Sequence, residues 1–200
     1  MGLVEGVLDH SVVYRLWQAP FAEQKFVPVL ANNDLRRVHR VLDVGCGPGT
    51  NTGHFTQVEY LGIDFNQRYI ESARRRHKRD FVVADVRNYR VTPGEQFDFV
   101  LANSFLHHLS TEHVLGILSH LRSLLSKDGH VHALELVMPE ERSIARLLAR
   151  WDRGDFARPA EEWRWIFGQH FEPVLIDFYP LTLMGTTLWN MVYFKGKPRK

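Results

Sequence analysis

Three glycines, at positions 45, 47 and 49, follow directly on an apolar run in the segment VLDVGCGPGT. Glycine adopts positive φ without strain and lets a ligand approach the backbone, and a helix that follows such a loop offers unbonded N–H groups. The pattern therefore predicts a site for a nucleotide-like ligand, with a purely structural turn as the alternative. Thr50 stands where a dinucleotide-binding loop would carry its third glycine, which disfavours NAD.

Polar residues follow three later apolar runs, at points where strands are expected to end. Asp64 closes LGID about 20 residues after Gly45, where an acid can reach ribose hydroxyls. Asp85 follows FVVA and could accept a hydrogen bond from an adenine amino group, and Asn103 closes FDFVLAN. Ligands of open α/β sheets bind outside the carboxyl ends of the strands, so we expect these positions to converge on one site.

The adjacent histidines His107 and His108 are the candidates for acid–base chemistry. Histidine titrates near neutral pH, so one of them could deprotonate a substrate; equally, one could cap or pack against the following helix. Cys46 is expected to be a small apolar filler and not a nucleophile, because the sequence ties no base to it. Asp43 could either order the glycine loop or contact the ligand.

Other ionisable residues are given structural roles or left open. His130 and His132 share one face of a strand, but further ligands are not apparent, so no metal site is predicted. The basic run at residues 74–79 is expected to form a solvated helix end far from the glycine loop, which argues against nucleic acid binding there. Arg153 and Arg158 could hold an acidic or hydroxylated acceptor or belong to a surface loop with neighbouring acids.

The elements that position these residues alternate between short apolar runs and helix-length segments, the pattern of a parallel sheet covered by helices. Strands are expected at residues 40–44, 60–63, 81–84, 97–102, 130–137, 174–179 and 188–194. Helices are expected at residues 50–55, 66–79, 111–126 and 140–151, with Gly129 as a stop signal after the third of these. Residues 180–187 are too few for a crossover, so the last two strands should pair antiparallel.

These elements predict an α/β fold with a doubly wound, mostly parallel seven-stranded sheet and a C-terminal antiparallel hairpin. Without repeats or linkers, residues 1–200 are expected to form a single domain. Residues 9–31 should form two short helices, broken at Pro20 and packed on the sheet, in which Tyr14 and Trp17 either cover the site or join the core. The expected parts are a helical cap (1–37), a cofactor-binding core (38–137), acceptor-side helices (138–171) and a strand pair (172–200).

The composition is that of a folded globular protein, with 44% hydrophobic and 24% charged residues among 200. No apolar run approaches the roughly 18 residues of a membrane span, and the N-terminal residues do not resemble a signal peptide. The single cysteine excludes an internal disulfide. We therefore expect a cytoplasmic protein, and a net charge of +2 gives no general reason to expect a nucleic acid partner.

Four segments, VLDVGCGPGT, YLGIDFN, FVVADV and FDFVLANSFLHHL, together resemble the successive motifs of class I S-adenosylmethionine-dependent methyltransferases, particularly the small-molecule branch. The resemblance covers about residues 38–137 and implies a Rossmann-like fold, S-adenosylmethionine as methyl donor and S-adenosylhomocysteine as product. It places the amino acid moiety at the glycine loop, the ribose at Asp64 and the adenine at Asp85, and it favours His108 over His107 as the base. The cofactor-binding residues expected in full are Asp43, Gly45, Cys46, Gly47, Asp64, Phe65, Asp85, Val86 and Asn103.

The expected function is methyl transfer to an oxygen, nitrogen or carbon atom of a small molecule. The fourth motif ends in NSFLHH and not in the Asn/Asp-Pro-Pro-aromatic signature of enzymes that methylate exocyclic amino groups of DNA and RNA. An RNA or protein methyltransferase and a non-catalytic cofactor-binding protein of the same fold are the alternatives.

Overall fold

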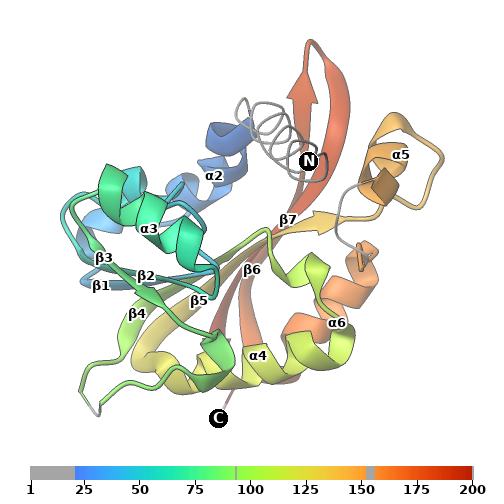
Figure 1. Cartoon of the computed structure of the whole chain (residues 1–200). Coiled ribbons are helices and arrows are strands. Elements are labelled where there is room, and N and C mark those ends of the chain that lie inside the picture. Colours follow the sequence, from blue (N-terminus) through green and yellow to red (C-terminus); the bar gives the residue numbers. More distant parts are fainter. Residues whose placement is uncertain (1–20, 93, 152–155, 200) are drawn as a thin grey trace, which may run out of the picture.

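A computed structural model describes the chain at residues 21–92, 94–151 and 156–199. Seven strands form one sheet in the order β3-β2-β1-β4-β5-β7-β6 (Figure 1). The first five pair in parallel, whereas β7 is antiparallel to both of its neighbours, which confirms the predicted doubly wound sheet and C-terminal hairpin. The strands are β1 (Arg40–Val44), β2 (Glu59–Asp64), β3 (Asp80–Val83), β4 (Phe97–Asn103), β5 (Leu125–Val137), β6 (Phe171–Leu183) and β7 (Thr186–Pro198).

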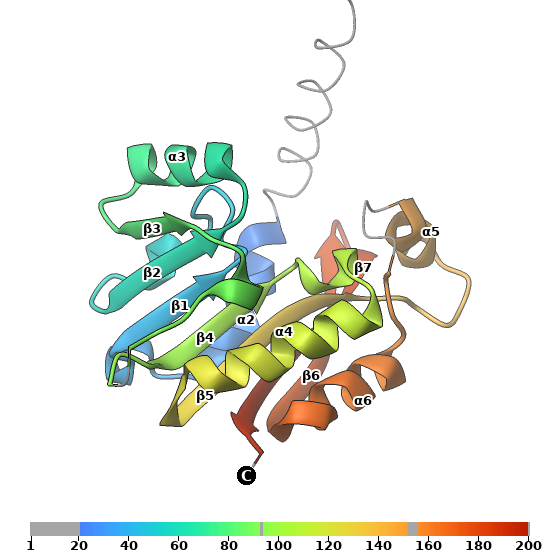
Figure 2. The ribbon, with the colours of Figure 1, turned by 60° about the horizontal axis from the view of Figure 1, so that its bottom comes forward.

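Helices cover both faces of the sheet. On one face lie α4 (Thr111–Leu124) and α6 (Ala160–His170), which Figure 2 shows in front of the strands. On the other lie α2 (Ala22–Ala31) and α3 (Gln67–Arg76). Successive strand residues point to opposite faces, and β4 follows this rule: Val100 and Ala102 pack in the cluster of α4 and α6, whereas Phe99 and Leu101 pack in the cluster of α2 and α3.

The helix α2 packs on the sheet through one buried side and makes polar contacts to β6. Phe26 is buried and stacks on the His54 ring at 4.0 Å between centroids. The Gln24 amide donates to the Thr182 carbonyl and accepts from the Thr182 N–H, both at 3.1 Å. The predicted packing of the second N-terminal helix on the sheet is thus confirmed; the first, with Tyr14 and Trp17, lies outside the described residues.

All four predicted helices are shorter than expected; α4 ends at Leu124, where β5 follows directly, and the other three are shortened for local reasons. Residues 50–55 form only a 3-10 turn, η3 (Thr52–His54), whose central residue Gly53 is a poor helix former. The helix expected to reach residue 79 ends at Arg76, because His77 is extended and Arg79 turns back to donate to the carbonyls of Phe55 and Val58. The helix α5 begins only at Ile144, where the Ser143 hydroxyl accepts from the backbone N–H of Arg146.

The C-terminal strands are longer than predicted. The expected glycine stop at Gly129 lies inside β5, which begins at Leu125 and changes register against β4 near its start. Strands β6 and β7 span thirteen residues each, because pairing continues past irregularities near Pro173 and Thr182. The hairpin turns through Met184 and Gly185, both at positive φ.

Candidate active site

The glycine loop between β1 and η3 is open on one side. Gly45, Gly47 and Gly49 have φ values of +66°, +54° and +82°, a region that other residues rarely adopt. The N–H groups of Gly45 and Cys46 both donate to the Ile63 carbonyl, at 2.8 and 3.1 Å, which fixes the loop on β2. A side chain at Gly47 would meet no atom within 4 Å, so the backbone there is accessible to a ligand.

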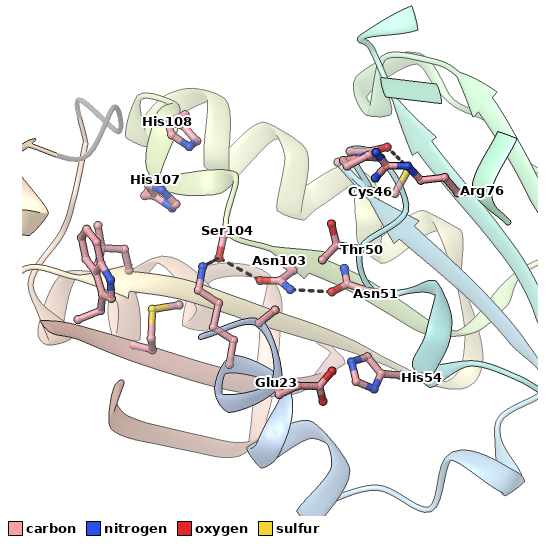
Figure 3. A pocket seen from close by; sticks show the side chains of 18 residues that line it. Glu23, Cys46, Thr50, Asn51, His54, Arg76, Asn103, Ser104, His107 and His108 are labelled. Atoms are coloured by element: carbon pink, nitrogen blue, oxygen red, sulfur yellow. Dashed lines mark hydrogen bonds between the residues drawn. The ribbon is translucent and has the colours of Figure 1, made fainter. Parts of the chain in front are cut away.

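A cavity of about 460 Å³ opens beside this loop (Figure 3). Its walls come from the glycine loop, from the ends of β4, β5 and β7, and from α2. Six of the predicted site residues line it: Gly45, Cys46, Gly47, Asn103, His107 and His108.

Asp43 lies beneath the loop, is fully buried, and is the first residue of a polar hydrogen-bond network. It accepts hydrogen bonds from the Tyr60 hydroxyl at 2.7 Å and from the Asn51 amide at 3.1 Å. Burial, only partly offset by these hydrogen bonds, raises the pKa of Asp43 to about 6. The contacts of Asp43 are those expected of a carboxylate that orders the loop, and the Asn103 amide extends the network into the cavity by donating to Asn51.

Asp64, Phe65, Asp85 and Val86 lie outside the cavity lining, at the ends of β2 and β3. The Asp64 carboxylate accepts from the N–H groups of Gly47, at 3.0 Å, and Asn66, at 2.8 Å. Phe65 is 81% exposed, an unusual position for an aromatic ring. The Arg87 guanidinium pairs with Asp85 and lowers the pKa of its carboxyl.

The two histidines lie on a tight turn, η5 (Leu106–His108), which a buried acid holds from β5. Glu135 is 0% exposed and accepts hydrogen bonds from the N–H groups of Phe105, Leu106 and His107. Its second oxygen also lies 2.6 Å from Nδ1 of His107, whose ring is only 3% exposed, whereas His108 is exposed. Figure 3 shows both rings at one end of the cavity.

Arg158 holds the same turn through its carbonyl groups. Its guanidinium donates to the carbonyls of Leu106 and Leu109, pairs with Glu162 and lies over the Trp163 ring. At 2% exposure Arg158 is part of the interior. The expectation that Arg158 belongs to a surface loop with neighbouring acids is therefore wrong, because its guanidinium is buried against the turn. Arg153 lies outside the described residues.

The basic run at residues 74–79, which begins on α3, differs from the expected solvated helix end. Arg74 donates to the Phe81 carbonyl at 2.6 Å, so it and Arg79 support the fold. Arg76, however, lines the cavity beside Cys46 (Figure 3), so the expectation that the whole run lies far from the glycine loop is wrong. The reason is that the end of α3 packs over the loop, with the His77 ring against Gly49.

The other predicted roles concern buried groups. Burial raises the pKa of the Cys46 thiol, which suits a filler and not a nucleophile. His132 stacks on Phe99 at 3.6 Å and contacts the Tyr193 hydroxyl at 2.8 Å, and burial lowers its pKa well below the usual value. Within residues 21–92, 94–151 and 156–199, no group of three or more His, Cys, Asp or Glu side chains could hold a metal, and no helix could span a bilayer.

Sequence reasoning missed Glu135, Lys25 and Arg76. Glu135 is the one acid within the apolar run HALELV, and a charge in such a strand was the signal that could have identified it. Lys25 donates to the Ser104 hydroxyl at 3.4 Å, and Ser104 itself adopts a positive φ of 58°. Strained backbone of this kind often marks functional sites, but it cannot be read from sequence.

Comparison with known proteins agrees with this geometry. A family profile described as a methyltransferase domain matches residues 41–129. The trans-aconitate 2-methyltransferase of Escherichia coli K12 is 35% identical over 119 residues, which are 57% of this chain and 44% of that protein. The chain thus spans less than half the length of the curated relatives it matches.

Solved structures share the fold at low sequence identity. A methyltransferase from Methanosarcina mazei superposes with a TM-score of 0.70 at 17% identity, over 86% of this chain and 98% of that one. The N-methyltransferase NodS from Bradyrhizobium japonicum, bound to S-adenosylhomocysteine, gives 0.68 at 15% identity, over 92% and 88%. The magnesium protoporphyrin IX methyltransferase of Synechocystis gives 0.65 at 17% identity, over 92% and 81%. Residues 41–129 thus match a methyltransferase domain, and the motifs and the sheet order agree with those of class I S-adenosylmethionine-dependent methyltransferases.

Proposed function

We propose that this protein transfers a methyl group from S-adenosylmethionine to an oxygen, nitrogen or carbon atom of a small molecule. The observation that carries the proposal is the cavity in which the open face of the glycine loop meets Asn103 and the histidine turn. Two relatives named for small acceptors, trans-aconitate and magnesium protoporphyrin IX, support an acceptor of that class.

The residues at the site suit this cofactor. The open space at Gly47 leaves room for the amino acid end. A carboxylate offers about four acceptor positions, and Asp64 uses two of them on backbone N–H groups, which leaves capacity for two ribose hydroxyls. The exposed Phe65 offers an apolar surface to the adenine, with Asp85 and Val86 at the end of the next strand.

When bound, the cofactor supplies a methyl group already activated by the positive charge on sulfur. The chain's own task is to hold the attacking atom about 3 Å from that methyl group, opposite the sulfur, since positioning alone can supply much of the rate enhancement. We assign residues 38–137 to the cofactor side. Lys25, Trp189 and Met191, from α2 and β7, line the cavity from outside this core and are the candidates to contact the acceptor.

Calorimetric titration with S-adenosylmethionine, S-adenosylhomocysteine and NAD tests the cofactor. We expect a Kd on the order of 1 μM for the first two, about 8 kcal/mol of binding free energy, and no binding of NAD. Absence of both heat and thermal shift with either adenosyl ligand would contradict the proposal.

The acceptor class is tested by transfer of labelled methyl from S-adenosylmethionine to a cell extract. The extract is divided into low-molecular-weight, RNA and protein fractions, and we expect the label in the first. Label in the RNA or protein fraction would identify a macromolecular methyltransferase instead.

A further inference from the structure

The buried carboxylate of Glu135 has four hydrogen-bond donors directed at it. Oε1 lies 3.2 Å from the N–H nitrogen of Phe105 and 2.9 Å from that of Leu106. Oε2 lies 3.3 Å from the backbone nitrogen of His107 and 2.6 Å from its ring Nδ1. A buried acid in an apolar strand is costly unless it is fully hydrogen-bonded, and this one is.

The three backbone N–H groups can only donate, so Glu135 acts as an acceptor toward the turn. The same oxygen that accepts from the His107 N–H lies 2.6 Å from Nδ1; an ionised Glu135 can only accept there, which assigns the shared proton to Nδ1. In a neutral imidazole with Nδ1–H, the lone pair resides on Nε2. Glu135 thereby determines which nitrogen of His107 can accept a proton.

The turn is also fixed from its carbonyl side. Arg158 donates to the carbonyls of Leu106 and Leu109, while the N–H of Phe156 donates to that of His107. Amide and carbonyl groups of one short turn are therefore held by β5 and by the segment before α6. The His107 ring has little freedom to reorient, as an oriented base requires.

We propose that Glu135 is a positioning residue that holds His107 in the Nδ1–H form, so that Nε2 takes the proton from a hydroxyl or amine of the acceptor. This inference rests on the proposed function. A lone pair on the acceptor's oxygen or nitrogen forms the new bond to the methyl carbon, and the C–S pair returns to sulfur. The O–H or N–H proton passes to Nε2, and its bond pair stays on the oxygen or nitrogen. The acceptor class is then a molecule whose attacking atom bears a proton, in contrast to a carboxylate that is ionised at neutral pH.

The charges around His107 come from several elements. Glu135 faces it from β5, the tilted His108 ring lies 4.2 Å away between centroids on the same turn, and Arg158 lies behind the turn. Lys25 from α2 and Arg76 from α3 share the cavity. Because several charged groups surround this ring, the test reads which ring nitrogen of His107 carries the proton.

Nitrogen NMR of histidine-labelled protein reads the tautomer without an acceptor. In the neutral ring of His107 we expect the proton on Nδ1. Glu135→Gln should move the proton to Nε2, because the glutamine NH₂ can donate to Nδ1, and the matched surface change Glu172→Gln should not. The wild-type spectrum decides the question even if Glu135→Gln fails to fold. A wild-type ring with the proton on Nε2 would overturn the proposal.

Two further measurements separate this inference from the proposed function. S-adenosylhomocysteine should bind wild type and His107→Gln equally, whereas label transfer to the low-molecular-weight fraction should fall by roughly 10²–10⁴-fold in the variant. Loss of S-adenosylhomocysteine binding by the wild type would defeat the proposed function itself. Trans-aconitate serves as the carboxylate probe and is expected not to be methylated; methylation at equal rates by wild type and His107→Gln would overturn the proton-transfer role.

Discussion

Nδ2 of Asn103, the last residue of β4, donates a hydrogen bond of 2.9 Å to Oδ1 of Asn51, just after the glycine loop. Asn51 in turn donates to the buried Asp43, and the Ser104 hydroxyl donates to Asn103 at 3.0 Å. With Lys25 bonded to Ser104, one polar chain runs from beneath the loop to the cavity wall. The cofactor end and the acceptor end of the proposed site are therefore mechanically connected.

Breaking the hydrogen bond between Asn103 and Asn51 should lower the free energy of unfolding. Asn103→Ala leaves Oδ1 of Asn51 without its donor in a buried position, a loss of about 1–3 kcal/mol in the free energy of unfolding. Denaturant unfolding of Asn51→Ala, Asn103→Ala and the double variant should give a coupling of about 0.5–3 kcal/mol. Additive effects would show that the hydrogen bond contributes nothing beyond the two separate side chains.

Asp64 is expected to contribute to cofactor affinity directly. Asp64→Ala should weaken S-adenosylhomocysteine binding by roughly 5- to 150-fold, because ribose hydroxyls lose about 1–3 kcal/mol of hydrogen bonding. Asp64→Asn keeps one acceptor oxygen and should lose less. The control is Asp80→Ala, an exposed acid at the opposite end of the neighbouring strand. An unchanged Kd in folded Asp64→Ala would remove this residue from the site.

His108 should affect the acceptor more than the proton transfer. Its side chain is exposed and lines the cavity, whereas the buried Glu135 faces the His107 ring. We expect His108→Ala to raise the acceptor KM while kcat changes little. His107→Gln should lower kcat instead. The reverse pattern, with kcat lost only in His108→Ala, would assign the base to His108, as the sequence resemblance favours.

Asp43 should make stability depend on pH in the sense opposite to most carboxyl groups. Folding raises its pKa from 3.8 to about 6, so its contribution is complete below pH 3.8 and is lost as the pH rises through 6. The unfolding free energy of the wild type minus that of Asp43→Asn should therefore fall by about 3 kcal/mol from acid to neutral pH. Parallel curves for the two proteins, measured by denaturant titration, would contradict the raised pKa.

Much of the sheet could be read from sequence because its strands are short, apolar and bounded by turn residues. Residues 40–44 match β1 fully, since both flanks carry polar or glycine signals. The extensions of β6 and β7 could not be predicted, because they depend on pairing between the two strands and not on residue type. This pairing continues β6 past Pro173 and Pro180.

Some residues of the candidate site could likewise be predicted from the sequence, and others could not. The glycine loop, Asn103 and the histidines were found because their spacing along the chain places them at strand ends. Glu135 acquires its position only through the register of β5 on β4, which sets Leu134 opposite Asn103. Arg76 reaches the cavity only because α3 ends early and folds over Gly49. Such long-range geometry is not encoded in local patterns.

The insertion of β7 between β5 and β6 has a consequence for synthesis on the ribosome. Residues 131–137 of β5 pair with residues 190–196 of β7, about 60 positions later, and β6 joins the sheet through β7. A nascent chain that has emerged only as far as β6 therefore exposes the backbone edge of a buried, apolar strand. Such an edge invites pairing with other chains. Translational pausing before β7, or truncation there, should yield a species that needs chaperone protection.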